Sequence, residues 1–189
     1  MPKQELISIL ELIDELSMCG TREAAEILLT RTKELLRADY AVCGTGSIDK
    51  KGIMKIQTII DADYPGEWLN LYFKEELYRY DPVVQYHMKF SEPELWSNIR
   101  QSYTDDKARA VTEWADAYGL KYGVSSSVYI PNTGMFSIFC FASAEDVFNE
   151  RHKGVLNALT LHLNMAITES SGGDPSGRKT TRASRPFIQ

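Results

Sequence analysis

Five side chains of this sequence carry polar tips that could hold a small ligand. Tyr64, Trp68 and Tyr72 recur at intervals of four residues, Asp81 stands directly before a proline, and Trp96 follows later. An indole donates only through its N–H, a phenol donates or accepts, and an ionised carboxylate only accepts. Residues four apart share one face of a helix, so Trp68 and Tyr72 are expected side by side. Together the five residues match a ligand that offers one N–H and two carbonyl groups.

Each of these residues also has an ordinary structural interpretation. A single buried tryptophan or tyrosine usually belongs to a hydrophobic core. An aspartate before a proline is also typical of a helix end or a turn, so Asp81 alone decides nothing. The joint spacing, rather than any one residue, favours a binding site.

The sequence offers few groups for catalysis. His87, His152 and His162 are scattered, and none has a serine or cysteine partner in a known motif. The glycines around Cys43 lack the lysine that a phosphate-binding loop requires. A lactone or amide hydrolase with Asp81 as its base is the enzymatic alternative, but it needs a nucleophile or a metal that the sequence does not supply. We therefore do not expect an enzyme.

Apolar periodicity divides the chain into helices and hairpins. Thr21 is expected to be the N-cap of the second helix, and Gly119 to stop the fourth. The third helix is expected to end at Asp81, because a residue before proline avoids the α region. The predicted helices span residues 6–16, 21–36, 68–80, 104–118 and 145–167, the last with about six turns.

Two hairpins are expected between these helices. Residues 39–48 and 52–60 are short and β-branched, and residues 122–143 contain two strands around a turn at 131–134. Because strand side chains alternate, Ser126, Val128 and Ile130 should face one side of the sheet and Ser125, Ser127 and Tyr129 the other. The element order indicates an α/β (α+β) fold, with a central antiparallel sheet of about five strands flanked by helices on both faces.

Composition is that of one globular domain of ordinary size. The chain has 189 residues, of which 43% are apolar and 25% charged, and a net charge of -5. Acidity argues against nucleic-acid binding, since phosphate neutralisation requires a basic surface. Three distant cysteines, Cys19, Cys43 and Cys140, fit reduced thiols better than disulfides or a metal site. The charged N-terminus resembles neither a signal peptide nor a membrane span, so we expect a cytoplasmic protein.

The C-terminal residues differ in composition from the rest. Residues 170–189 are rich in glycine, proline and basic side chains and contain little to bury. We therefore expect one domain over residues 1–169 and a flexible basic tail over residues 170–189.

The motif set resembles a known family. Tyr64, Trp68, Tyr72, the run Asp81-Pro82-Val83-Val84 and Trp96, with GLKYG at residues 119–123, look like the autoinducer-binding domain of LuxR-type quorum-sensing regulators. The similarity covers residues 6–167. Members of that family fold as an α/β/α sandwich that encloses an N-acyl homoserine lactone between the sheet and one helical layer.

The resemblance implies a role for each residue of the set. Trp68 would donate its indole N–H to the lactone carbonyl, and Asp81 would accept the amide N–H of the ligand. Tyr64 would donate to the acyl carbonyl, Tyr72 would pack along the acyl chain, and Trp96 would lie against the lactone ring. The apolar wall would come from Val83, Val111, Ala115 and Leu120.

Two positions depart from some members of the family. Where certain members carry a hydroxyl on the late strand, this chain offers Cys140, a weaker donor. A register shift of one residue would place Phe139 in the pocket instead. Where some members carry an arginine that reaches an oxygen on the third acyl carbon, this chain has Leu69, which argues against a preference for a 3-oxo group.

The resemblance also implies partners. The ligand would be an N-acyl homoserine lactone, with no cofactor and no metal, and the chain would form a homodimer or a heterodimer with a full-length LuxR-type regulator. The helix-turn-helix of the family needs roughly sixty residues, so residues 170–189 cannot contain it, and no direct contact with DNA or a membrane is expected from this chain. A receptor domain that regulates transcription is the first hypothesis. A natural short decoy that inhibits a full-length regulator through mixed dimers is the alternative.

Overall fold

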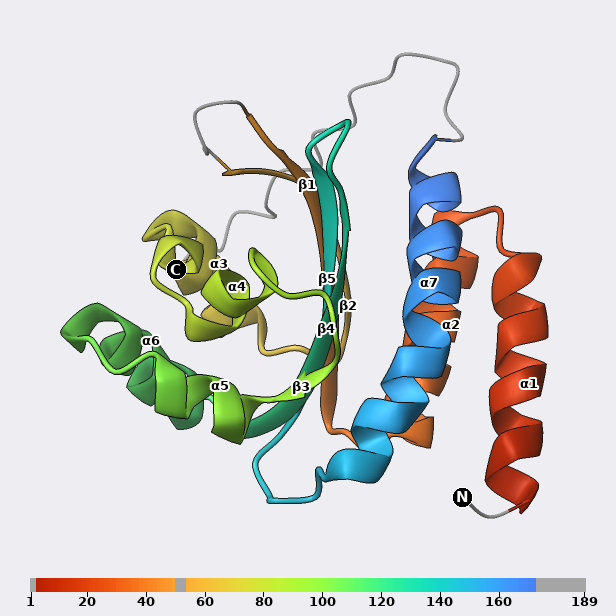
Figure 1. Cartoon of the computed structure of the whole chain (residues 1–189), viewed down its shortest axis with the longest axis horizontal. Coiled ribbons are helices and arrows are strands. Elements are labelled where there is room, and N and C mark those ends of the chain that lie inside the picture. Colours follow the sequence, from red (N-terminus) through yellow and green to blue (C-terminus); the bar gives the residue numbers. More distant parts are fainter. Residues whose placement is uncertain (1–2, 50–53, 173–189) are drawn as a thin grey trace, which may run out of the picture.

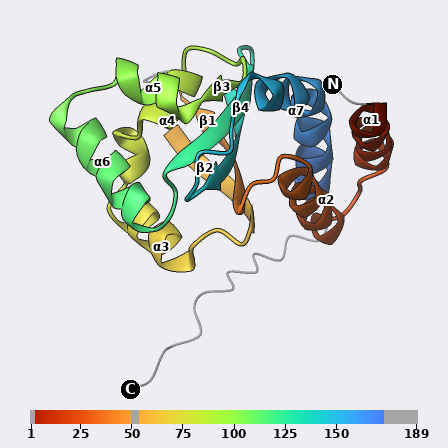
Figure 2. The ribbon, with the colours of Figure 1, turned by 90° about the horizontal axis from the view of Figure 1, so that it is seen from below.

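The computed structural model describes residues 3–49 and 54–172, which form three layers (Figure 1). A sheet seen edge-on stands between two groups of helices, and the view from below shows the same separation (Figure 2). One face is covered by α2 (Arg22–Leu35) and α7 (Glu150–Gly172), with α1 (Lys3–Ser17) packed on the outer side of these two helices. The other face is covered by α3 (Gly66–Lys74), α4 (Pro82–His87), α5 (Trp96–Ser102) and α6 (Asp106–Ala117). The predicted fold class is confirmed.

The described strands form one antiparallel sheet in the order β2-β1-β5-β4-β3. Both predicted hairpins are present, and the turn of the first one lies outside the described residues. The short edge strand β3 was not predicted. The strands are β1 (Tyr40–Ile48), β2 (Met54–Ala62), β3 (Glu94–Leu95), β4 (Tyr122–Ile130) and β5 (Met135–Ser143).

The main hydrophobic core lies between the sheet and α1, α2 and α7. Phe139 and Phe141 of β5 are fully buried there, together with Leu156 and Leu159 of α7. Thr21 caps α2, because its side chain accepts a hydrogen bond from the Ala24 amide, as the sequence predicts. This core occupies one face of the sheet, and the candidate site lies on the opposite face.

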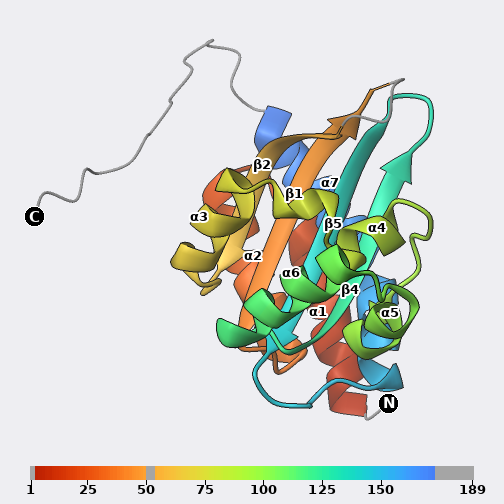
Figure 3. The same cartoon turned by 90° about the vertical axis from the view of Figure 1, so that its left-hand side faces the viewer.

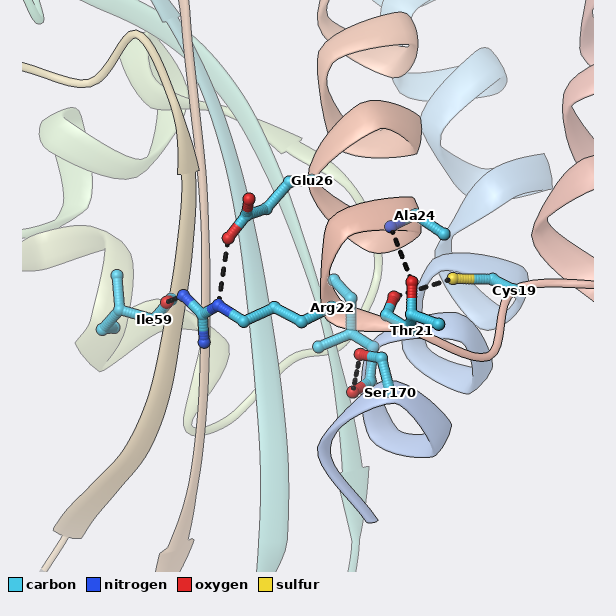
Figure 4. Close-up of polar contacts among 8 residues, drawn as sticks. Cys19, Thr21, Arg22, Ala24, Glu26, Ile59 and Ser170 are labelled. Carbon is cyan, nitrogen blue, oxygen red and sulfur yellow. Dashed lines mark hydrogen bonds and ion pairs between the residues drawn. The ribbon is translucent and has the colours of Figure 1, made fainter. Parts of the chain in front are cut away.

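Helix α2 also holds the edge strand β2 (Figure 4). The guanidinium of Arg22 donates through Nη2 to the carbonyl of Ile59 at 2.8 Å, and its Nε donates to Glu26 at 3.0 Å. An edge strand exposes unpaired carbonyl groups, and this contact satisfies one of them. The backbone of Ile59 is therefore anchored from the side of the sheet that α2 covers, whereas its side chain points to the opposite face.

The prediction of one helix from residue 68 to Asp81 is wrong. Helix α3 ends at Lys74, Glu76 adopts a left-handed conformation with φ 51°, and a short 3-10 helix η1 (Leu77–Arg79) follows. Asp81 then starts α4 as its N-cap instead of ending a helix, with the proline at the first helical position. Neither α4 nor α5 was predicted, because helices this short show less than two turns of periodicity.

The remaining predicted elements need smaller corrections. Helix α6 begins after its N-cap Asp105, and Gly119 follows with a φ of 82° that suits a helix stop. Helix α7 begins at Glu150 rather than 145, and it continues to Gly172, beyond the domain boundary expected at residue 169. The rest of the expected tail, residues 173–189, lies outside the described residues.

Strand alternation in β4 follows the prediction. Ser126 accepts a hydrogen bond from Thr160 of α7, whereas the side chains of Ser125 and Ser127 contact α4 and the loop after it. The two faces of the sheet therefore bind different helical layers. The layer made of α3 to α6 stands in front of the sheet in Figure 3, and it covers the candidate site.

Candidate functional site

A cavity of about 100 Å³ lies between the sheet and the layer made of α3 to α6. A cavity needs only about 10–15 Å³ of such space to hold one water molecule, so this one has room for a small organic molecule. All ten residues singled out from the sequence line it. They are Tyr64, Trp68, Tyr72, Asp81, Val83, Trp96, Val111, Ala115, Leu120 and Cys140.

Asp81 presents a fixed carboxylate to this cavity. Its Oδ1 accepts the amide N–H of Val83 at 2.8 Å, and its Oδ2 accepts the hydroxyl of Tyr72 at 2.7 Å. Burial raises the pKa of the Asp81 carboxyl above its ordinary value, although both hydrogen bonds oppose the shift. A carboxylate has about four lone-pair sites, so the two hydrogen bonds leave acceptor capacity for a ligand N–H.

Aromatic side chains surround this carboxylate. The rings of Trp68 and Tyr72 lie side by side on α3 with centroids 5.4 Å apart, and Trp68 also contacts Tyr118 at 5.7 Å. The Tyr64 ring meets the edge of Tyr40 at 6.3 Å. Burial raises the pKa of both Tyr64 and Tyr72 well above the ordinary value, so both phenols keep their protons and can donate.

Trp96 lines the cavity, and its indole packs against β4 at Gly123. A Cβ at Gly123 would lie 2.4 Å from Cδ2 of the Trp96 ring, so only glycine admits the indole here. The guanidinium of Arg100 lies 5.5 Å from the centre of the same ring. Nε1 of Trp96 is buried and has no hydrogen-bond partner within the part of the chain that the structure describes.

Cys140 lines the cavity, whereas Phe139 belongs to the core on the opposite face. The alternative register with Phe139 in the pocket is therefore wrong. Burial raises the pKa of the Cys140 thiol well above its ordinary value, with a further contribution from Asp81. The thiol is thus a neutral, weak donor close to the carboxylate.

Several lining residues were not identified from the sequence. Arg100 reaches the cavity from α5 and is held by Asp116 at 3.0 Å and by the Leu120 carbonyl at 3.0 Å. Arg100 comes four residues after Trp96, so the two share one face of a helix, and this spacing could have identified Arg100 from the sequence. Leu69, noted only as a departure from relatives, also lines the cavity. The strands add a group that we call the apolar arm: Gly44, Met54, Ile56, Ile59, Phe136 and Ile138.

One serine–histidine contact lies outside the cavity. With its proton on Nδ1, His87 donates to the Phe90 carbonyl at 3.0 Å, and its Nε2 accepts from the Ser125 hydroxyl at 2.9 Å. This pair was not identified from the sequence. His87 and Ser125 are 4% and 0% exposed and neither lines the cavity, so a substrate there cannot reach them.

Within residues 3–49 and 54–172 no group of three or more His, Cys, Asp or Glu side chains is placed to hold a metal ion. None of the helices in these ranges is long and apolar enough to cross a membrane.

Solved structures share this architecture. The chain superposes on the N-acylhomoserine lactone dependent LuxR family factor CepR2 of Burkholderia cenocepacia with a TM-score of 0.67 and 21% identity, covering 87% of this chain and 93% of that one. Against Escherichia coli SdiA the TM-score is 0.71 with 16% identity, covering 87% and 68%. At these identities the likeness shows the fold alone.

Sequence comparison identifies the family. The chain is 24% identical to the transcriptional activator LuxR of Aliivibrio fischeri over 156 residues, which make up 82% of this chain and 59% of that protein. It thus spans less than two thirds of the length of that relative. The family model described as autoinducer binding domain matches residues 21–167. The chain therefore belongs to the autoinducer-binding domain family of LuxR-type transcriptional regulators.

Proposed function

We propose that the cavity binds an N-acyl homoserine lactone and that binding is coupled to dimerisation and to the control of transcription. The observation that carries this proposal is the position of Asp81. A carboxylate fixed by two hydrogen bonds stands at the wall of an otherwise largely apolar cavity, beside the donors of Trp68 and Tyr64. The dependence of CepR2 on an N-acylhomoserine lactone supports the same ligand class.

In this proposal the polar head of the ligand occupies the end of the cavity nearest Asp81. The amide N–H donates to Asp81, the acyl carbonyl accepts from Tyr64, and the lactone carbonyl accepts from the indole of Trp68. Each donor or acceptor of the head then has one partner of opposite type. A charged acceptor gives the stronger kind of hydrogen bond, so Asp81 is expected to contribute most of the polar affinity.

The acyl tail occupies the apolar arm. Each buried methylene contributes about 0.8 kcal/mol, so a tail of six methylenes contributes roughly 5 kcal/mol before entropic losses. Affinity is therefore expected to depend strongly on tail length.

The proposal predicts that ligand stabilises the fold. A ligand at a hundred times its dissociation constant stabilises the native state by about 2.7 kcal/mol, which raises the melting temperature of a domain this size by several degrees. The measurement is thermal unfolding with N-acyl homoserine lactones of increasing tail length, followed by mass analysis of the ligand. An intact ligand and a raised melting temperature are expected. No shift with any lactone would contradict the proposal, and hydrolysed ligand would favour an enzyme.

A further inference from the structure

One position on the floor of the cavity has no side chain. In β1, an interior strand of the sheet, Gly44 pairs with Ile59 of β2 on one side and with Ile138 of β5 on the other. Strand β2 bulges at Gln57, opposite the step from Thr45 to Gly46, and Arg22 anchors the Ile59 backbone from the other face of the sheet. Gly44 therefore leaves a gap between two branched apolar side chains that both line the cavity.

The backbone does not require glycine at this position. Gly44 lacks the positive φ seen at Gly119 and Gly134, and a Cβ built on it meets only Cδ1 of Ile59, at 3.3 Å. That atom is the far end of a flexible side chain, which can move. Gly46 is different, because a Cβ there would lie 2.3 Å from the Lys55 carbonyl. Glycine weakens a strand interior, and it often marks a place where a ligand approaches the backbone.

Gly44 lies along the path from the polar head to the end of the apolar arm. Its neighbour on the same face, Val42, pairs with Cys140, whose thiol lies close enough to Asp81 for the carboxylate to raise its pKa. Two residues of strand span roughly 7 Å, so the pair Gly44 and Ile138 lies about that distance further along the sheet than the pair Val42 and Cys140. Phe136 and Met54 line the cavity further along.

We propose that Gly44 determines which acyl chains the cavity accepts, because it lets a tail that extends beyond Val42 and Cys140 lie directly against β1. This inference rests on the proposed lactone binding and adds its length specificity. A side chain at residue 44 would occupy the space of the middle of the tail while leaving Asp81, Trp68 and Tyr64 unchanged. It would therefore penalise long tails and spare short ones.

The test compares N-butanoyl and N-octanoyl homoserine lactone by calorimetry on the wild type, Gly44→Ala and Gly44→Val. Each methylene that loses burial weakens binding about fourfold. We expect Gly44→Val to weaken octanoyl binding at least tenfold and butanoyl binding less than threefold, with Gly44→Ala between it and the wild type. Thr45→Val is the matched control, because Thr45 is the next residue on β1 and lines a separate cavity under α7. It should leave both affinities within twofold.

The outcomes separate this inference from the proposed function. A wild type that binds neither lactone would defeat the proposed function itself. A wild type that binds lactone, with variants that weaken both ligands equally or neither, would overturn the role of Gly44 alone. A wild type that prefers butanoyl over octanoyl would overturn it as well. If Gly44→Val shows no cooperative unfolding, Gly44→Ala decides, with an expected loss of at least threefold confined to octanoyl.

Discussion

Replacing Asp81 by asparagine is expected to weaken binding of an N-acyl homoserine lactone by at least tenfold. The variant keeps one oxygen for the Val83 amide but places an NH₂ donor where the carboxylate offered a second acceptor. The ligand amide N–H then faces a donor and stays unpaired in a buried site. An unpaired buried group costs about 1 to 3 kcal/mol, and more when a charged partner is lost. Isothermal titration calorimetry measures the change directly.

A matched control separates binding from folding. Asp105 caps α6 as Asp81 caps α4, accepting the amides of Lys107 and Ala108, but it does not line the cavity. Asp105→Asn should bind the lactone as the wild type does. The unliganded Asp81→Asn chain should melt no lower than the wild type, because burial makes the charged carboxylate unfavourable at neutral pH. Equal affinities for both variants would contradict the assigned role of Asp81.

The second large effect concerns acid stability. His87 is buried between α4 and β4, and burial lowers its pKa from the ordinary 6.5 to about 4, although Glu94 and Glu92 act in the opposite direction. The unfolded chain takes up a proton below about pH 6.5, whereas the folded chain does so only near pH 4. Stability is therefore complete above pH 6.5 and falls on acidification through this window. The loss amounts to about 3 kcal/mol, at 1.36 kcal/mol per unit of pKa.

Urea unfolding at pH values from 7 to 4 measures this loss. His87→Gln should be less stable at pH 7, since it breaks the contacts with Ser125 and Phe90, and its stability should fall less steeply with acidification. Part of the slope will remain, because burial also lowers the pKa of His152. His162→Gln on α7 is the control for replacing a histidine outside the contact between α4 and β4. An unchanged slope in His87→Gln would show that His87 does not titrate as described.

Much of the fold was predictable because its signals are local. Alternation specified both faces of β4, whereas Cys140 of β5 came from the family resemblance, with Phe139 as the alternative that the structure excludes. Capping chemistry gave Thr21 as the start of α2. These features depend on a few adjacent residues, so a sequence alone contains them.

Other parts of the fold depend on tertiary packing. The break after α3 comes from Glu76 in a left-handed conformation, which glutamate adopts only when the surrounding structure holds it there. Asp81 before a proline fits both a helix end and a helix start, and packing decided for the start of α4. Helices α4 and α5 are too short for a periodic pattern.

The candidate site likewise contains residues that were predictable from the sequence and residues that depend on tertiary structure. Residues with polar tips stood out by type and spacing, and the structure brings them to one cavity; their contacts with a ligand remain a prediction. The apolar arm was not predicted, because it depends on how β1, β2 and β5 pair. Ile56 and Ile59 are three residues apart and would face opposite sides of a regular strand, but the extra residue Gln57 forms a bulge between them in β2, so both line the cavity.

A crystal structure of this chain with bound N-octanoyl homoserine lactone tests the proposed ligand position most directly. The ligand amide nitrogen should lie within about 3 Å of a carboxylate oxygen of Asp81, and the lactone carbonyl should accept from the indole of Trp68. The acyl tail should run over Gly44 toward Phe136. A ligand bound elsewhere, or one in this cavity whose amide points away from Asp81, would contradict the account.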